Sequence, residues 1–208
     1  MKSVFFSLVL IGLSAQSHPV SYKDATGLMS YNNSQMNEIL LTYSLTHEQA
    51  VGLTYIREKK SEFYIPRLNY LAKRWNNDDS QGNLYLSLGS GIEKYAANQY
   101  NVKLGEIVAD WESRKYYIYL EHLHMFRDNI VNPLWTERDD NHTKFRLGFA
   151  PFLADYNDLN IWAIAQMTKH NTENIETTQF IRFYMKNILW EIGADFNGGF
   201  AFNFMIYI

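Results

Sequence analysis

The sequence predicts an all-β protein, a closed antiparallel up-and-down barrel of about twelve strands. After residue 25, apolar residues recur with a period of two rather than 3.6. Aromatic residues make up 16% of the chain, with 15 Tyr and 13 Phe, and these residue types favour strands over a helical bundle. The predicted strands follow one another through short connections. A meander of this kind either closes on itself or leaves two unpaired edges.

Each predicted strand is a run of alternating residues bounded by a polar or glycine-containing turn. The runs cover residues 26–32, 36–45, 50–58, 63–75, 82–92, 103–111, 115–126, 143–154, 159–170, 177–185, 188–196 and 200–208. A barrel of ten strands is the alternative, in which two of the shorter runs are not strands.

The first 17 residues have the features of an export signal. Lys2 supplies a positive charge, residues 4–13 form an apolar core too short to span a bilayer, and Ala15 and Ser17 are small residues at the cleavage positions. No later segment holds about 18 consecutive apolar residues. The predicted organisation is therefore a signal peptide (1–17), a short periplasmic segment (18–25) and an outer-membrane β-barrel domain (26–208).

The composition removes several classes of function. The chain has no Cys, which excludes disulfides, thiolate metal sites and a lipid-bearing cysteine. Its net charge of −3 gives no reason to expect a nucleic-acid partner.

The alternation leaves open which face of the sheet meets water. Phe145, Leu147 and Phe149 share one face, and Lys144 and Arg146 lie on the other. A soluble barrel hides its apolar face inside, whereas a membrane barrel turns it towards lipid and encloses the charges. In the membrane case, the following residues form a charge network in the lumen: Arg67, Lys73, Glu106, Asp110, Lys115, Glu121, Lys144, Arg146, Arg182, Glu191 and Asp195.

Three observations favour the membrane barrel. The two longest connections, residues 93–102 and 127–142, fall on the same predicted side, opposite short turns. Near the short turns stand four tryptophans that we expect at the membrane interface, namely Trp75, Trp111, Trp162 and Trp190. The last predicted strand, residues 200–208, is apolar on one face and has no polar tail after it.

With these features, residues 26–208 resemble a bacterial outer-membrane β-barrel. Phe204, Ile206 and Ile208 are similar to the C-terminal signal that the barrel-assembly machinery reads, although the last residue is Ile where Phe is usual. The resemblance implies an outer-membrane location with both termini in the periplasm, and contact with outer-membrane lipid and lipopolysaccharide. No motif specifies a subfamily or an oligomeric state.

The predicted function is a narrow pore, or a protein that binds or transports a small solute or ion, because side chains largely fill a lumen of twelve strands. The basic residues of the lumen could select anions, or could pair with Glu106, Glu121 and Glu191. One alternative is an outer-membrane enzyme acting on lipid or lipopolysaccharide, but no Ser–His pair has a diagnostic spacing. Another is a soluble periplasmic barrel of the lipocalin kind.

Histidines gather at the ends of three predicted strands. His122 and His124, His142, and His170 would all lie at the outward end of the barrel, close to Asp128, Glu137, Asp139 and Asp140. Imidazole and carboxylate groups together bind divalent metals such as zinc or copper. The alternative is that these are ordinary polar residues at the water boundary. No other cofactor is predicted.

Overall fold

The chain folds into one closed barrel of twelve antiparallel strands, each paired with its neighbours in sequence. The computed structural model describes residues 18–127, 139–155, 157–171 and 173–208. The predicted signal peptide and residues 128–138 lie outside this range. No helix in the described part of the chain is long and apolar enough to cross a membrane.

The strands are β1 (Thr26–Asn32), β2 (Met36–Ser44), β3 (Gln49–Glu58), β4 (Ser61–Asn76), β5 (Ser80–Tyr95), β6 (Asn98–Ser113), β7 (Tyr116–Arg127), β8 (Asp139–Phe149), β9 (Asn160–His170), β10 (Glu176–Met185), β11 (Ile188–Asp195) and β12 (Phe200–Tyr207).

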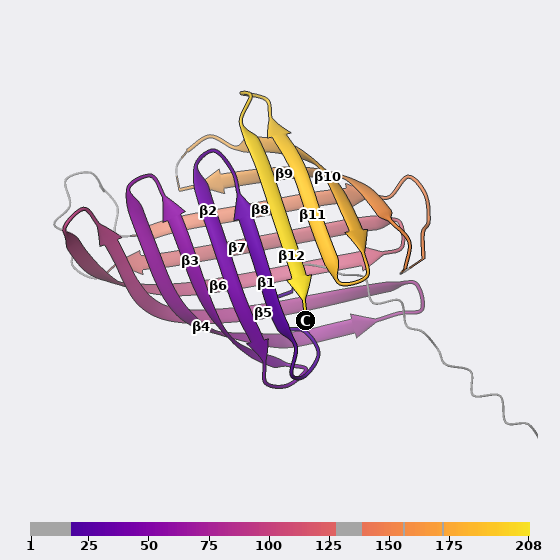
Figure 1. Cartoon of the computed structure of the whole chain (residues 1–208), viewed down its shortest axis with the longest axis horizontal. Coiled ribbons are helices and arrows are strands. Elements are labelled where there is room, and N and C mark those ends of the chain that lie inside the picture. Colours follow the sequence, from indigo (N-terminus) through magenta and orange to yellow (C-terminus); the bar gives the residue numbers. More distant parts are fainter. Residues whose placement is uncertain (1–17, 128–138, 156, 172) are drawn as a thin grey trace, which may run out of the picture.

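The barrel closes where the first strand meets the last. β1 pairs with β12 in an antiparallel register that runs from Gly27 opposite Tyr207 to Asn32 opposite Phe202. Figure 1 shows these two strands side by side, with the C-terminus at the lower end of β12. The predicted closure of the meander is confirmed, and it leaves neither of these strands with a free edge.

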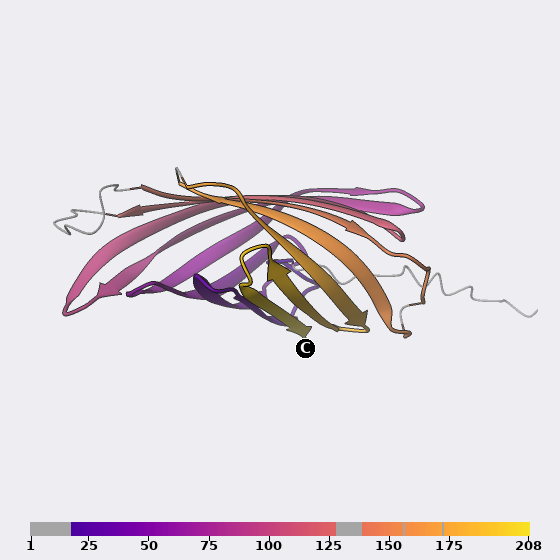
Figure 2. The same cartoon turned by 90° about the horizontal axis from the view of Figure 1, so that it is seen from above.

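The barrel is flattened rather than round. In Figure 1 the strands β5 to β8 run across the picture behind β1, β2, β11 and β12, which run steeply down the front. Seen from above in Figure 2, the two walls lie close together. This shape brings side chains of opposite walls within reach of each other.

Apolar side chains point outward and charged ones point inward. Leu68 and Leu88, which are cross-strand neighbours, are 64% and 71% exposed. Arg146 and Glu191 are 3% and 1% exposed on the inner face. A lipocalin-like barrel would have the opposite arrangement, so the orientation agrees with the membrane interpretation.

Apolar and aromatic side chains also occupy the inside. Tyr85, Tyr117 and Trp162 belong to one buried cluster, and Phe63 and Met125 belong to a second. The lumen of this twelve-stranded barrel is therefore largely filled, as the sequence predicts.

Some predicted connections are wrong. Residues 93–102 were expected to be a long loop, but β5 continues to Tyr95 and β6 begins at Asn98. Here both sheet faces carry polar residues, so the alternation that marks a strand is missing from the sequence. The predicted strand 143–154 ends early at Phe149, and residues 150–159 form a long connection on the side expected to have short turns. The predicted contrast in loop length is therefore weaker than expected.

Two side chains face the opposite way from the prediction. The register of β4 against β5 shifts between Leu71 and Lys73. A bulge of this kind exchanges the two faces, so Lys73 is exposed, while Arg74 bonds Asn83 inside. Trp162 was expected at the membrane interface, but it is 6% exposed and packs inside. Trp75, Trp111 and Trp190 are exposed on the outer surface.

The outward position of Leu68 gives a test of what surrounds the barrel. In liposomes, Leu68→Arg should lower the free energy of unfolding by about 2–4 kcal/mol, because the charge would enter hydrocarbon near its midplane. Asn101→Arg, at an exposed position near the start of β6, is the control and should cost about 0–1 kcal/mol. Equal and negligible effects of both substitutions, measured by urea titration, would indicate that water surrounds the barrel.

Candidate functional site

The inner wall carries paired charges, and Glu191 of β11 accepts hydrogen bonds from three other strands. Arg182 Nε donates to one oxygen at 2.7 Å, and Arg146 NH2 and Asn203 Nδ2 donate to the other, each at 2.7 Å. The Arg182 guanidinium also lies 4.6 Å from the centre of the Tyr117 ring. Two arginines on one carboxylate leave this group of buried charges net positive.

Further ion pairs lie at other points of the same surface. Arg67 of β4 pairs with Glu106 of β6, and its Nε donates to Asn69 at 2.7 Å. Lys144 Nζ lies 2.9 Å and 3.1 Å from the two oxygens of Glu121. Buried ion pairs of this kind are costly to break, because the remaining partner would be an unpaired buried charge.

The structure places eight of the eleven predicted lumen charges inside. These are Arg67, Glu106, Asp110, Glu121, Lys144, Arg146, Arg182 and Glu191. Lys73 and Lys115 are exposed. Asp195 accepts hydrogen bonds from the backbone of Asn197 and Gly199 and so stabilises the β11–β12 turn.

The predicted lumen charge network did not include several charged residues that point inward, among them Glu58, Glu93 and Arg127. Arg127 Nε donates to Glu93 at 2.8 Å, and its NH2 donates to Asp140 at 3.0 Å. Glu93 also accepts a hydrogen bond from Ser61 at 2.6 Å. Glu93 and Arg127 lay beyond the predicted ends of their strands, so extending β5 and β7 to their true ends would have placed them inside. Glu58 lay at the end of the predicted strand 50–58, where its inward phase was not used.

Residues 18–25, predicted as a short periplasmic segment, fill the barrel end near the chain termini. Val20 and Ala25 are fully buried, and Val20 packs in the cluster that contains Tyr85 and Tyr117. The backbone of His18 both donates to and accepts from the Tyr207 hydroxyl, at 2.8 Å and 2.6 Å. Its Nδ1 lies 3.4 Å from Asp110 Oδ2 inside the barrel.

A small cavity lies among the charges towards the other end of the barrel. It measures about 30 Å³, and Tyr31, Lys144, Arg146 and Asn203 are among the residues that line it. This volume holds about one or two water molecules. Solutes would have to displace side chains to pass it.

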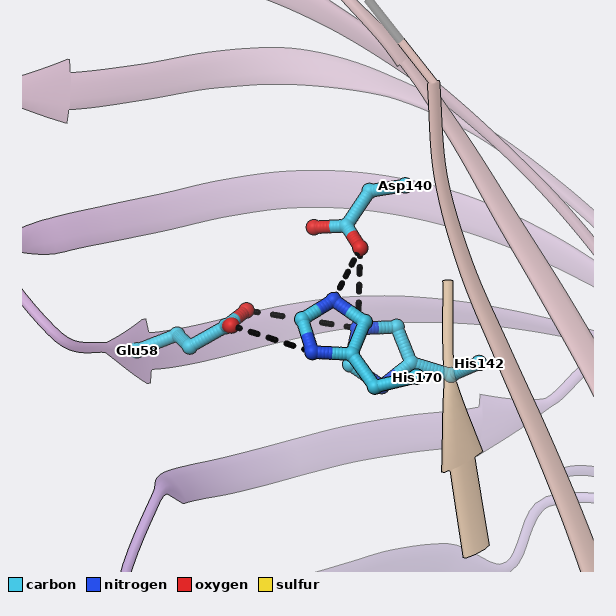
Figure 3. A group of neighbouring side chains, drawn as sticks. All are labelled: Glu58, Asp140, His142 and His170. Atoms are coloured by element: carbon cyan, nitrogen blue, oxygen red, sulfur yellow. Dashed lines mark hydrogen bonds and ion pairs between the residues drawn. The ribbon is translucent and has the colours of Figure 1, made fainter. Parts of the chain in front are cut away.

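The four predicted metal-binding histidines do not come together. His122 and His124 lie on the outer face, where their Nδ1 atoms contact Thr143 at 2.9 Å and Asn141 at 2.7 Å. His142 and His170 lie on the inner face, with ring centroids 4.0 Å apart and planes at 18°. Figure 3 shows these two rings between Asp140 and Glu58. His122 and His124 share a face because they are two apart on one strand. This pair lies on the opposite side of the barrel wall from His142 and His170.

This histidine–carboxylate cluster, defined as Glu58, Asp140, His142 and His170, lies beyond the apolar band. At its level the outward-facing neighbours are His122, Asn141, Thr143 and Lys169, all polar. His170 Nδ1 is 3.7 Å from Glu58, and its Nε2 bonds Asp140 Oδ1. His142 Nε2 lies 3.4 Å from Asp140 and 4.0 Å from Glu58.

The carboxylates shift the protonation of this cluster. The hydrogen bond to Asp140 raises the pKa of His170. Burial raises the pKa of Glu58. Burial acts in the same direction on Asp140, but the two imidazoles beside it hold its pKa well below the usual range. The cluster therefore attracts positive charge, whether as protons or as a cation.

Comparison with known proteins gives the fold. No family model and no curated protein sequence matches the chain. A solved structure described as KdgM porin in complex with disordered oligogalacturonate is similar, with a TM-score of 0.51 and 10% identity over 88% of this chain and 97% of that chain. The chain therefore shares the barrel fold of this solved porin.

Other porins are similar at lower scores. The KdgM porin alone gives a TM-score of 0.48 with 10% identity, covering 88% of this chain and 97% of that one. OccAB4 of Acinetobacter baumannii gives 0.42 with 10% identity, covering 86% of this porin-like barrel and 55% of the solved chain.

The charges around Glu191 give a prediction about stability. Glu191→Gln removes the negative partner of two buried arginines and should lower the free energy of unfolding by about 3–5 kcal/mol. Lys115→Gln, an exposed turn substitution, should change it by no more than about 0.5 kcal/mol. Urea unfolding of both variants in the same detergent checks this. A loss below 1 kcal/mol for Glu191→Gln would show that the pairing contributes little.

Proposed function

We propose that this chain is a bacterial outer-membrane channel that passes small solutes, cations in preference to anions, through a narrow lumen. Residues 18–25 close its mouth near the termini. The observation that carries the proposal is a charged inner wall in a barrel whose outer wall is apolar. A purely structural interior would need no charges, because apolar side chains fill space without a desolvation cost.

The preference for cations follows from the balance of inward charges. Acidic side chains outnumber basic ones: Glu38, Glu58, Glu93, Glu106, Asp110, Glu112, Glu121, Asp140 and Glu191 stand against Arg67, Arg74, Arg127, Lys144, Arg146 and Arg182. A pore wall of one net sign concentrates ions of the opposite sign. Galacturonate carries a carboxylate on each sugar, so this lumen does not suit the oligogalacturonate named with the KdgM porin.

Residues 18–25 act as the stopper of the channel. Residues 18–23 are held to the barrel by few polar contacts. These are the two bonds between His18 and Tyr207, the 3.4 Å contact of His18 with Asp110, and one bond from the Ser21 backbone to Ser44 Oγ at 2.9 Å. Val20 supplies the packing. Residues 18–23 can therefore leave the mouth without disturbing any strand pairing, whereas Asp24 and Ala25 are bonded to the Ser44 backbone next to the β1–β2 ladder.

The surroundings of the barrel follow from the same orientation. We expect outer-membrane lipid and lipopolysaccharide to cover the outer face, with both termini on the periplasmic side. The last strand and the residue that follows it, with Phe202 and Ile208 exposed, are expected to be the part that the barrel-assembly machinery reads during insertion.

Planar-bilayer recording tests the channel and its stopper together. Protein lacking residues 1–23 should give larger single-channel steps than protein lacking residues 1–17, because the mouth would be open. Tyr22→Ala in the longer form is the control, since Tyr22 is 58% exposed and its loss should leave the stopper in place.

The reversal potential in a KCl gradient should have the sign expected for K⁺ permeation. Absence of steps from both truncated forms would contradict the channel, and equal steps would contradict the stopper. A reversal potential of the opposite sign would contradict the cation preference.

A further inference from the structure

The histidine–carboxylate cluster joins two walls of the barrel that are not neighbours in the sheet. Glu58 ends β3, Asp140 and His142 belong to β8, and His170 ends β9. One candidate donor atom from each residue lies within 4.8 Å of the other three. We propose that Glu58, Asp140, His142 and His170 bind a single divalent transition-metal ion, best matched by zinc. This inference does not depend on conduction through the lumen.

Two buried atoms in the cluster have no hydrogen-bond partner. They are Glu58 Oε2 and His142 Nε2, which lie 4.0 Å apart and face each other. Glu58 is 2% exposed. A buried polar atom left unpaired destabilises the fold, because it has lost its hydrogen bonds to water and gained none in the protein. One cation between these two atoms would satisfy both, whereas a proton would satisfy them only if they were closer.

The spacing is close to what a tetrahedral ion requires. Metal–ligand bonds of about 2.0–2.1 Å place neighbouring donors about 3.3 Å apart. The separation of His142 Nε2 from Asp140 Oδ1 is 3.4 Å, and that from Glu58 Oε2 is 4.0 Å. All four donor atoms lie within 4.8 Å of one another, so they need to close by at most about 1.5 Å, which side-chain rotation supplies without moving the strands.

The donor types select the kind of metal. Two imidazole nitrogens with two carboxylate oxygens suit zinc, and also copper or nickel. Calcium and magnesium prefer a shell of oxygen atoms only, so they fit this set less well.

The groups around the cluster hold Asp140 in a binding geometry. Arg127 NH2 donates to Asp140 Oδ2 at 3.0 Å, which leaves Oδ1 directed at the two imidazoles. Arg127 is held in turn by Glu93 at 2.8 Å. Hydrogen-bonded carboxylates of this kind are the usual second layer of a metal site, and their loss typically costs 10–100-fold in affinity.

In the experiment, zinc is titrated into the whole folded protein in detergent. Calorimetry measures binding, and thermal unfolding measures the change in unfolding temperature. One equivalent of Zn²⁺ should bind and raise the unfolding temperature. Glu58→Gln and His142→Gln should each weaken binding on the order of 100-fold or more, at least as much as the loss of an outer-layer partner. Mobility of the unheated sample on a gel shows whether each variant has folded.

The histidines on the outer wall provide the matched control. The double variant His122→Gln/His124→Gln removes two imidazoles from the same barrel end and should leave zinc affinity and stoichiometry unchanged. Loss of binding in this control, with binding kept in His142→Gln, would overturn the assignment. So would wild-type protein that neither binds one equivalent of Zn²⁺ nor unfolds at a higher temperature with it, because protons alone would then account for the cluster.

Discussion

The structure depends on one constraint, which is that backbone N–H and C=O groups inside hydrocarbon must bond to one another. An open sheet cannot meet this condition, because its two edges would remain unpaired. Here the pairing of β1 with β12 closes the sheet. Once the sheet is closed, each strand has one face towards lipid and one towards the lumen, and the period-two pattern of the sequence decides which residues go where.

The same closure makes the lumen a place where charges must find partners. Arg146 reaches Glu191 from three strands away, Arg182 reaches it from the neighbouring strand, and Arg127 reaches Glu93 and Asp140. Because the barrel is flattened (Figure 2), side chains also meet across it, as Glu58 does with His142 and His170. The buried charges tie the walls together and give the lumen the polarity on which both its proposed selectivity and the proposed metal site depend.

Much of the fold could be predicted from the sequence, because alternation is a local property. The number of strands, the closure and the inward direction of residues such as Arg67 and Glu191 all follow from it. Three kinds of feature could not be predicted. The bulge before Lys73 adds one residue that no hydropathy pattern marks. The strand ends at Tyr95 and Asn98 are polar on both faces. The meeting of Glu58 with His170 joins strands far apart in the sheet, so only the three-dimensional path of the chain brings them together.

The most direct test of the central claim is spin labelling along β4. The chain has no Cys, so each introduced cysteine carries the only label. Labels at Leu68 and Tyr70 should collide readily with oxygen dissolved in lipid and poorly with a water-soluble nickel chelate. Labels at Arg67 and Asn69 should be protected from dissolved oxygen. If the alternation had the opposite phase, or if Leu68 were accessible to the nickel chelate, the apolar face would not be facing lipid and the account would be contradicted.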